Sequence, residues 1–391
     1  MTNQQRVLVR GVGVVPFGRH LDRTLRSLAE EATTAALKDA GLTPDDVDVV
    51  FFSNSVAGIT TGQEAIRGQT ALRQTGLLGK PVFNVENACA SGSSAFLLAR
   101  TGLLAGNWRR AVVVGAEKMF HADKSVPFKA LAAASDLSER PEGEDTGAKS
   151  VFMDLYAERT REYMARSGAT QDDFAAVVVK NRRHATHNPA AQYRTPVELA
   201  DVLGSGEVVW PLTRFMCSPI SDGAAALVLA IDDGNGAAGR KVEVLASTLH
   251  SGDPEHPTGY VARVAGIAYE AAGVGPEEVD VVELHDAASP AELEYSEALG
   301  LCPEGGGPEL LRSGATRLGG RVPINPGGGL IARGHPVGAT GVAQLVEVTL
   351  QLRGDAGGRQ VEGARIGLVQ NAGGSVGGTS AASAVHILAR T

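Results

Sequence analysis

The sequence predicts an α/β fold made of two similar halves, and three observations lead to this expectation. First, segment 40–50 returns as 272–282, each copy with a Gly, a Pro and two acidic residues before an apolar strand. Second, a strand and a helix precede each copy in the same order. Third, glycine-rich loops follow expected strands of the second half. Two β-α-β-α-β units would stack their sheets back to back, with helices between and outside them; the alternative is a chance likeness of two helix-turn-strand units.

The elements expected in the two halves match in order. We expect strand 7–15, helix 28–40 and strands 82–84 and 111–115 in the first half, and strand 242–247, helix 261–272 and strands 322–325 and 366–369 in the second. Each helix ends at a glycine, as helices commonly do.

An insertion separates the two halves. Roughly residues 117–240 include a polar tract at 136–149, which is typical of a loop segment that covers one face and carries binding. We therefore expect the following domains: an N-terminal half at 1–116 plus part of 217–240, an inserted loop domain at 117–216, and a C-terminal half at 241–391.

Composition limits the class of protein. The chain has 391 residues, 43% of them hydrophobic and 20% charged, as in soluble globular proteins, and its net charge of −8 argues against a nucleic-acid surface. Apolar runs stay shorter than the ~18 residues of a membrane span, and the N-terminus lacks a signal-peptide core, so we expect no membrane association and a cytoplasmic location. Cys89, Cys217 and Cys302 are too few and too scattered for a disulfide framework, which suits a reducing compartment.

Cys89 is the candidate nucleophile. It lies between an apolar stretch at 81–85 and a run of small residues at 88–95 that leads into a helix. This order predicts a strand, a tight turn and a helix, with the thiol at or near the helix N-terminus. Free N–H groups and the helix dipole favour a thiolate there. The alternative is a small core residue.

Two histidines and a glycine-rich loop are candidates from the second half. His285 closes the strand that follows the repeated turn, at the carboxyl end where α/β sites usually form. His335 lies in a loop that corresponds, by pseudo-symmetry, to the loop that bears Cys89. The segment 370–378 follows the last apolar strand of the repeat. A structural role for either histidine is the alternative, but these loops converge if a pseudo-twofold axis relates the halves.

The chain resembles the thiolase superfamily, and within it the sterol carrier protein 2 type, from about residue 6 to the C-terminus. The segments that carry this resemblance are 87–93, 115–119, 218–225, 283–286, 297–305 and 334–336. The resemblance implies the thiolase fold, with five layers in the order α/β/α/β/α and the loop domain inserted. It also implies an acetyl-CoA C-acyltransferase type of activity in lipid metabolism, with a coenzyme A thioester as substrate and no permanently bound cofactor.

The resemblance implies a role for each candidate. Cys89 would attack the thioester and carry the acyl group, because a thiolate both attacks and leaves thioesters well. His335 would activate Cys89 and donate to the thioester oxygen, and His285 would hold a water or carbonyl oxygen at the same oxyanion site. The N–H groups of Cys89 and Gly373 would make a second oxyanion hole. Asn325 would shape the site or be purely structural.

The departures from the family are informative. Ordinary thiolases have an acid/base cysteine in a Cys-x-Gly motif, where this chain has Asn371, and the sterol-carrier type has it after His-Asp, where this chain has Ala287. Neither residue exchanges a proton near neutral pH. Cys217 and Cys302 lie in no motif that would bring them to the site. The step that forms a carbanion therefore lacks its usual base, and general acid/base catalysis is typically worth about 10²–10⁴-fold.

Three interpretations of function follow. The chain could be a thiolase-like acyltransferase that uses a histidine as base, or a substrate that supplies its own carbanion, for a Claisen-type condensation or transfer to a thiol. It could be a standard 3-ketoacyl-CoA thiolase whose base comes from elsewhere. It could also be a non-catalytic or partner-dependent subunit with a small OB-fold and zinc-ribbon protein. The resemblance implies a homodimer.

The loop domain leaves the cofactor-binding residues open. Lys180, Arg182 and Arg183 could meet the phosphates of coenzyme A, or form a solvated basic helix end. His184 and His187 are three residues apart but lack nearby carboxylate or cysteine ligands, so we expect no metal site.

Overall fold

The computed structural model describes residues 5–139, 146–147, 150–234, 241–256 and 258–391, so part of the polar tract 136–149 lies outside the described residues. In the described residues, one mixed sheet has nine strands in the order β3-β2-β4-β7-β1-β8-β11-β10-β9. The strands are β1 (Val7–Val14), β2 (Val49–Ser53), β3 (Val82–Val85), β4 (Arg110–Glu117), β7 (Gly223–Ile231), β8 (Val242–Ser251), β9 (Val281–Glu283), β10 (Ile366–Gly373) and β11 (Ala382–Arg390).

The sheet consists of two halves, as the repeat predicts. Strands β3, β2, β4, β7 and β1 belong to the first half, and β8, β11, β10 and β9 to the second. The halves join where β1 pairs with β8, through Leu8 opposite Glu243 and Val9 opposite Val242. Two separate sheets were expected, and this short junction makes them one sheet that folds around a central helical layer.

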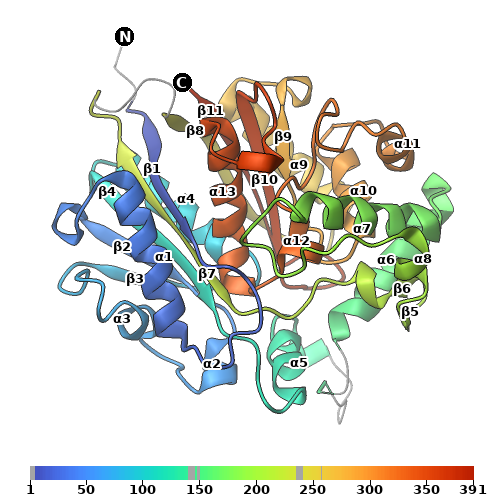
Figure 1. The fold of residues 1–391 in the computed structure, drawn as a ribbon, viewed down its shortest axis with the longest axis horizontal. Helices are drawn as coiled ribbons and strands as arrows, with labels where there is room; N and C mark the ends of the chain where they lie inside the picture. Colours follow the sequence, from blue (N-terminus) through green and yellow to red (C-terminus); the bar gives the residue numbers. More distant parts are fainter. Residues whose placement is uncertain (1–4, 140–145, 148–149, 235–240, 257) are drawn as a thin grey trace.

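The helices form three of the five layers (Figure 1). Helix α1 (Leu25–Ala40) packs on β1, β7 and β4 from outside, and α9 (Tyr260–Ala272) packs on β8 and β11 from outside. Helices α4 (Ser91–Leu104) and α13 (Val337–Arg353) pack against each other and against both halves of the sheet. The expected α/β/α/β/α order of layers is therefore confirmed.

Local sequence explains where the outer helices end. Gly41 and Gly273 cap α1 and α9 in the left-handed region, with φ of 66° and 69°. After each cap, a short 3-10 turn, Pro44–Asp46 or Pro276–Glu278, leads into β2 or β9. The repeated Gly-Pro-acid-acid pattern thus forms the same turn twice.

Glycines let the two central helices cross closely. A Cβ on Gly92 of α4 would lie 2.8 Å from the backbone nitrogen of Val342, and a Cβ on Gly341 of α13 would lie 2.7 Å from that of Ser93. Such distances exclude a larger residue unless the backbone moves. This crossing brings the beginnings of α4 and α13, and the loops before them, to one place.

Two expected elements differ from the structure. Residues 322–325 form no strand, and only Ile324 makes an isolated bridge, to Val282. Residues 370–373, expected in a loop, continue β10, because β11 pairs with β10 as far as Gly373. Antiparallel pairing with a late strand is a long-range effect that the local sequence does not reveal.

Helices between β4 and β7 cover one end of the sheet. They are α5 (Ser125–Ala132), α6 (Val151–Ser167), α7 (Gln171–Ala185) and α8 (Leu199–Leu203), with the hairpin β5 (Glu207–Val209) and β6 (Leu212–Thr213). The other short helices are α2 (Ala57–Thr61), α3 (Arg67–Ala71), α10 (Pro290–Ala298), α11 (Gly307–Arg312) and α12 (Gly329–Arg333). The domain boundaries stay predictions. Among the described helices, none is both long and apolar enough to span a bilayer.

Candidate active site

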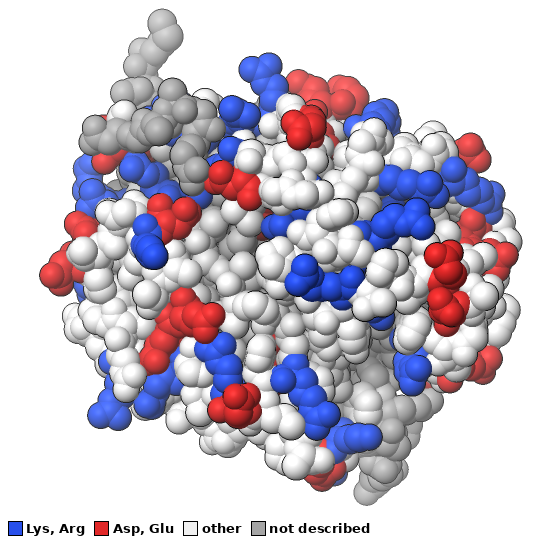
Figure 2. Space-filling model, in the orientation of Figure 1, with Lys and Arg blue, Asp and Glu red and all other residues white. Residues whose placement is uncertain are grey.

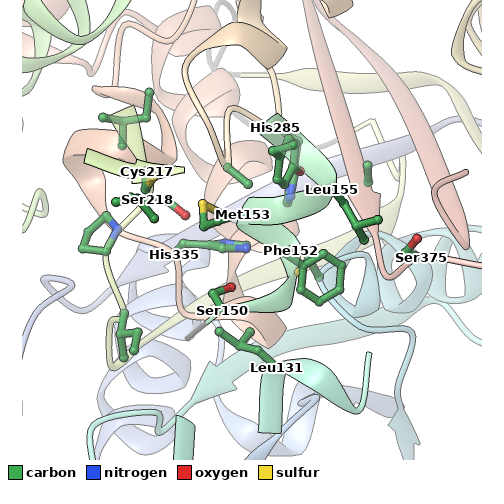
Figure 3. A pocket seen from close by; sticks show the side chains of 18 of the residues that line it. Leu131, Ser150, Phe152, Met153, Leu155, Cys217, Ser218, His285, His335 and Ser375 are labelled. Carbon is green, nitrogen blue, oxygen red and sulfur yellow. The ribbon is translucent and has the colours of Figure 1, made fainter. Parts of the chain in front are cut away.

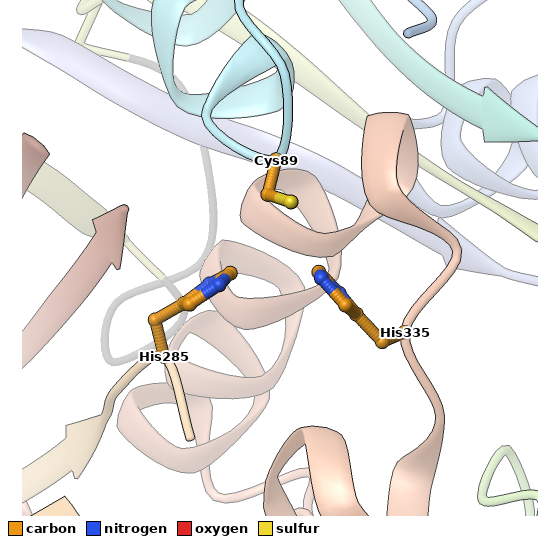
Figure 4. A group of neighbouring side chains, drawn as sticks. All are labelled: Cys89, His285 and His335. Atoms are coloured by element: carbon orange, nitrogen blue, oxygen red, sulfur yellow. The ribbon is translucent and has the colours of Figure 1, made fainter. Parts of the chain in front are cut away.

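Three predicted residues meet at the point where the halves face each other (Figure 4). Cys89 lies two residues before α4, His335 lies two residues before α13, and His285 lies two residues after β9. The Cys89 sulfur and one ring nitrogen from each histidine are all within 4.8 Å of one another. The two imidazole rings meet edge to face, with centroids 5.0 Å apart. The repeat therefore places Cys89 and His335 at equivalent positions of the two halves.

The hydrogen bonds of His335 fix its tautomer. Nδ1 lies 2.7 Å from Oγ1 of Thr340, and this hydroxyl donates to the carbonyl of Pro336 at 3.1 Å. The hydroxyl proton is therefore in use, so Thr340 accepts from Nδ1–H of His335. The Nε2 lone pair is left free to take a proton.

His285 has the opposite tautomer. Its Nδ1 lies 3.0 Å from Nδ2 of Asn371, an amide nitrogen that only donates. Nδ1 therefore accepts, and Nε2 carries the proton. The backbone N–H of His285 also donates to Gln370 Oε1 at 3.1 Å, which ties the loop to β10. One histidine thus offers an acceptor and the other a donor.

The expected thiolate at Cys89 is not what the structure favours. Burial raises the pKa of the Cys89 thiol to about 12, although backbone N–H groups of Gly374 and of Cys89 itself act in the opposite direction. The nearby carboxylate of Glu117 raises it further. The effect of the helix N-terminus is therefore outweighed by desolvation, and the resting residue is a thiol.

Both histidines are neutral at rest. Burial lowers the pKa of His285 to about 3, and it lowers the pKa of His335 well below the usual range, with a further contribution from His285. A thiol beside two neutral imidazoles carries no net charge. The proton of Cys89 therefore moves only when negative charge develops on a bound substrate.

A buried ion pair links the two histidine loops. Glu283 Oε2 lies 3.0 Å from a guanidinium nitrogen of Arg333, and the two side chains are 0% and 2% exposed. Glu283 precedes His285 by two residues, and Arg333 precedes His335 by two. An acid and an arginine, each two residues before a histidine, are a pattern in the sequence that indicates this ion pair. We did not predict it from the sequence.

Glu117 links the Cys89 side of the site to α13. Oε2 accepts hydrogen bonds from the N–H groups of Gly338 and Ser55, both at 2.9 Å. Oε1 accepts from Asn54 Nδ2 at 2.7 Å and from the N–H of Val56 at 3.2 Å. Burial raises the pKa of Glu117 to about 7 in spite of these donors.

A cavity of about 730 Å³ opens over the three residues (Figure 3). Most of its wall is apolar, and the predicted loop domain contributes Phe128, Leu131, Phe152, Met153, Leu155 and Tyr156 to it. Such a cavity suits a thioester arm with an acyl chain.

Cys217 also lines this cavity, which corrects the expectation that no motif brings it to the site. The N–H of its neighbour Ser218 donates to the carbonyl of Ala287 at 2.9 Å, so the chain passes beside the His285 loop. Burial raises the pKa of the Cys217 thiol to about 12. Cys217 does not belong to the group formed by Cys89 and the two histidines, and it offers no base near neutral pH.

Gly373 ends β10 against the turn that carries Cys89. A Cβ on Gly373 would lie 2.9 Å from the Cys89 nitrogen and 2.4 Å from the Ala90 nitrogen, so only glycine fits. The backbone N–H that acts to lower the pKa of the Cys89 thiol belongs to the next residue, Gly374, which the sequence did not single out. The oxyanion role of Gly373 stays a prediction.

Asn325 and His184 support the site from behind. Asn325, at a φ of 54°, accepts from the Leu284 N–H through Oδ1 and donates to Glu292 through Nδ2. Its carbonyl lies 3.0 Å from Nδ1 of the buried His184. These contacts place Asn325 in a structural role and explain His184 without a metal.

In the described part of the chain, one group of side chains has the spacing of metal ligands, Cys89 with His285 and His335. These ligand types suit Zn²⁺. The same spacing is what a proton relay requires, and the opposite tautomers already account for both histidines.

Two sequence models of one family match the chain. The model described as "Thiolase, N-terminal domain" matches residues 8–209, and the model described as "Thiolase C-terminal domain-like" matches residues 246–390. Together they include all three residues of the candidate site.

Known proteins agree with these matches. An acetyl-CoA acetyltransferase of Methanothermobacter thermautotrophicus is 39% identical, over 98% of this chain and 99% of its own. The benzoylsuccinyl-CoA thiolase subunit BbsB of Thauera aromatica is 37% identical over 93% of each chain. Human sterol carrier protein 2 is 36% identical over 94% of this chain and 70% of its own.

Solved structures show the same fold. The Ltp2-ChsH2(DUF35) aldolase has a TM-score of 0.79 at 24% identity, and each chain is covered to 98%. A human mitochondrial 3-ketoacyl-CoA thiolase in complex with CoA has a TM-score of 0.75 at 18% identity, over 99% of this chain and 98% of its own. With both family models and full-length relatives in agreement, the chain belongs to the thiolase family and is an acyltransferase of that family, whose substrates are coenzyme A thioesters.

Proposed function

We propose that the chain forms an acyl-enzyme on Cys89 from an acyl-CoA and passes the acyl group to a carbon or thiol acceptor. The observation that carries this proposal is the pair of opposite tautomers: a free Nε2 lone pair on His335 and an Nε2–H on His285. Acyl transfer needs one group that takes the thiol proton and another that stabilises the oxyanion.

The proton balance of the first step follows from these roles. The Cys89 sulfur attacks the thioester carbonyl while its proton passes to Nε2 of His335. The oxyanion accepts a hydrogen bond from the Nε2–H of His285. The imidazolium of His335 is then a second hydrogen-bond donor. When the tetrahedral intermediate collapses, the bond to the coenzyme A sulfur breaks, and His335 returns its proton to that leaving group. The acyl-enzyme is left beside two neutral histidines.

The second step lacks a separate base. Ala287 lines the cavity where the sterol-carrier type has a cysteine, and Asn371 is committed to Nδ1 of His285. After the first step, the neutral His335 is again a proton acceptor. We therefore propose that His335 serves both steps, or that the acceptor forms its carbanion without a base.

A second candidate is a partner-dependent reaction. The 37% identical Thauera protein is named as a subunit, so a small OB-fold and zinc-ribbon protein stays a possible partner. We also propose a homodimer, because β3 is an edge strand of the sheet and Phe83 on it is 44% exposed. A second copy could pair with that edge. We propose the cytoplasm as its location, because three scattered cysteines suit a reducing compartment.

Intact-protein mass spectrometry tests the proposal. After mixing with acetyl-CoA and with longer acyl-CoAs, the wild type should gain one acyl mass and Cys89→Ala should gain none, while Cys217→Ala should still be acylated. The absence of an adduct on the wild type, or the same adduct on Cys89→Ala, would refute the proposal.

Exchange of acetyl-CoA α-protons in deuterated water separates the versions of the second step. Acylation together with exchange supports His335 as the base of both steps. Acylation without exchange favours an acceptor that makes its own carbanion. If either reaction appears only after a small partner is added, the partner-dependent version is supported.

A further inference from the structure

The face of the molecule in Figure 2 shows no single cluster of basic side chains for an anionic substrate group. On the face in Figure 2, basic and acidic side chains are interspersed. The basic residues at the end of α7 differ from one another in their exposure and in their charged partners. Lys180 forms an ion pair with Glu292 at 2.6 Å, and Arg183 is exposed to solvent. Arg182 is 6% exposed and lines the cavity above Cys89.

Arg182 has no carboxylate partner among the described residues. Its guanidinium stacks on Tyr193, 4.2 Å from the ring centroid, and on Phe215, 5.2 Å from the ring centroid. Its Nε is buried and has no acceptor. The aromatic faces attract the cation but accept no strong hydrogen bond, so a buried charge with unused donors faces the cavity. Burial lowers the pKa of Arg182, and Tyr193 acts in the opposite direction.

We propose that Arg182 binds an oxyanion of the thioester substrate, an inference that rests on the acyl transfer proposed above. A guanidinium presents a planar set of donors that matches a carboxylate or a phosphate, and the two aromatic rings hold this plane in place. Arg214 lies over the ring of Phe215 at 5.5 Å, lines the same cavity and is exposed. An anion that enters the cavity would thus pass an exposed cation before it reaches the buried one.

A small-molecule anion fits this position better than a side chain of a partner protein. Arg182 and Cys89 line one continuous cavity, so a ligand on Arg182 and an acyl group on Cys89 can belong to the same molecule. The oxyanion has two possible sources: a phosphate of coenzyme A, or a carboxylate on the acyl chain.

Three thioesters distinguish these sources. Acetyl-CoA has phosphates and no carboxylate, succinyl-pantetheine has a carboxylate and no phosphate, and acetyl-pantetheine has neither. For each, the thioester concentration that gives half-maximal acylation is measured by mass spectrometry. The variants are Arg182→Met, which keeps the stacked chain without its charge, and Arg182→Lys, which keeps the charge without the planar fork. The matched control is Arg183→Met, one residue along the same helix and exposed.

The expected result is selective. Arg182→Met should raise the half-maximal concentration on the order of 10- to 100-fold for the thioester whose anion it binds, and leave acetyl-pantetheine within about twofold. Arg182→Lys should recover part of this loss, and Arg183→Met should change none of the three. A loss for acetyl-CoA identifies the phosphate, and a loss for succinyl-pantetheine identifies the carboxylate. Equal changes for all three thioesters would overturn the proposal.

Failure of the acyl transfer itself would be recognised separately. If the wild type is not acylated, calorimetry measures binding of coenzyme A, pantetheine and succinyl-pantetheine to the wild type and to both Arg182 variants. Selective weakening of one anionic ligand still supports the anion site. Equal affinities for wild type and variants would refute it.

Discussion

The two halves of the molecule share a backbone plan but differ in how they hold charge. Cys89 and His335 occupy equivalent turns before α4 and α13. On the Cys89 side, the buried carboxylate of Glu117 is held by four N–H donors and, in the described structure, has no ion pair. On the histidine side, buried acids are paired with arginines, Glu283 with Arg333 and Glu347 with Arg359.

This difference separates what the duplicated fold determines from what individual residues determine. The duplicated fold brings two turns face to face, but it does not decide which residue gives a proton and which takes it. That decision comes from Thr340 and Asn371, each of which fixes one histidine tautomer. Replacing residues on either side tests how much each half contributes.

Loss of the base on the histidine side should have the largest effect. His335→Gln should lower the acylation rate about 10²–10⁴-fold at pH 7, because no group then takes the proton from Cys89. The rate of the variant should rise about tenfold per pH unit across pH 7–10, because the pKa of the Cys89 thiol lies near 12. The wild-type rate should stay nearly flat there. Stopped-flow acylation measures both, and a flat profile for the variant would contradict the role of His335.

Breaking the ion pair between the two histidine loops should come next. Arg333→Met leaves Glu283 buried without its partner, which typically costs about 3–5 kcal/mol in the free energy of unfolding. Adding Glu283→Gln should recover part of that cost. Arg166→Met, in an ion pair whose arginine is 43% exposed, should cost less than about 1 kcal/mol. Urea unfolding measures the free energy of unfolding of both single variants and of the double variant. If the losses in the two single variants add up to the loss in the double variant, Glu283 and Arg333 do not stabilise each other.

Reversing the His285 tautomer should have a somewhat smaller effect. In Asn371→Asp, the carboxylate accepts from Nδ1–H, so Nε2 of His285 loses the proton that faces the oxyanion. The acylation rate should fall about 10²–10³-fold, as when an oxyanion donor is removed. The pKa of His285, now lowered by burial to about 3, should rise beside the new charge and give the rate a new pH dependence. An unchanged pH profile would speak against this tautomer role.

The smallest change is expected on the Cys89 side. Glu117→Gln turns an acceptor into an amide NH₂ that faces N–H donors, which typically costs about 1–3 kcal/mol in unfolding free energy. Because the pKa of Glu117 in the folded protein, about 7, lies above its ordinary value of 4.5, the stability that it contributes is present below pH 4.5 and is lost as the pH rises through 7. The free energy of unfolding, measured with urea, should therefore fall less between pH 4.5 and 8 in Glu117→Gln than in the wild type. The exposed Glu362→Gln should match the wild type.

The sequence predicted much of the fold and the three central residues. The repeated turn predicted α1, β2, α9 and β9, and the resemblance of two loops predicted that Cys89 and His335 face each other. It could not predict the raised pKa of Cys89, because the residues that pack against the thiol, such as Met119 and Val337, come from distant parts of the chain.

Other features also depend on contacts that no local pattern reveals. The extension of β10 through Gly373 follows from its pairing with β11, and the place of Cys217 in the cavity wall follows from the path of the chain beside Ala287. The isolation of Arg182 needed the structure as well, because Lys180 and Arg183 look equivalent to it in sequence.

The central position of α13 has a consequence for biosynthesis. Nearly every residue of this helix is buried, and it packs on β4, β7 and α4 of the first half as well as on β10 of the second. On the ribosome, the strands of the first half are made before α13, so their inner face stays uncovered until this later helix is available. The first half therefore completes its core only after most of the second half has also been made, and until then it exposes the apolar surface that chaperones recognise.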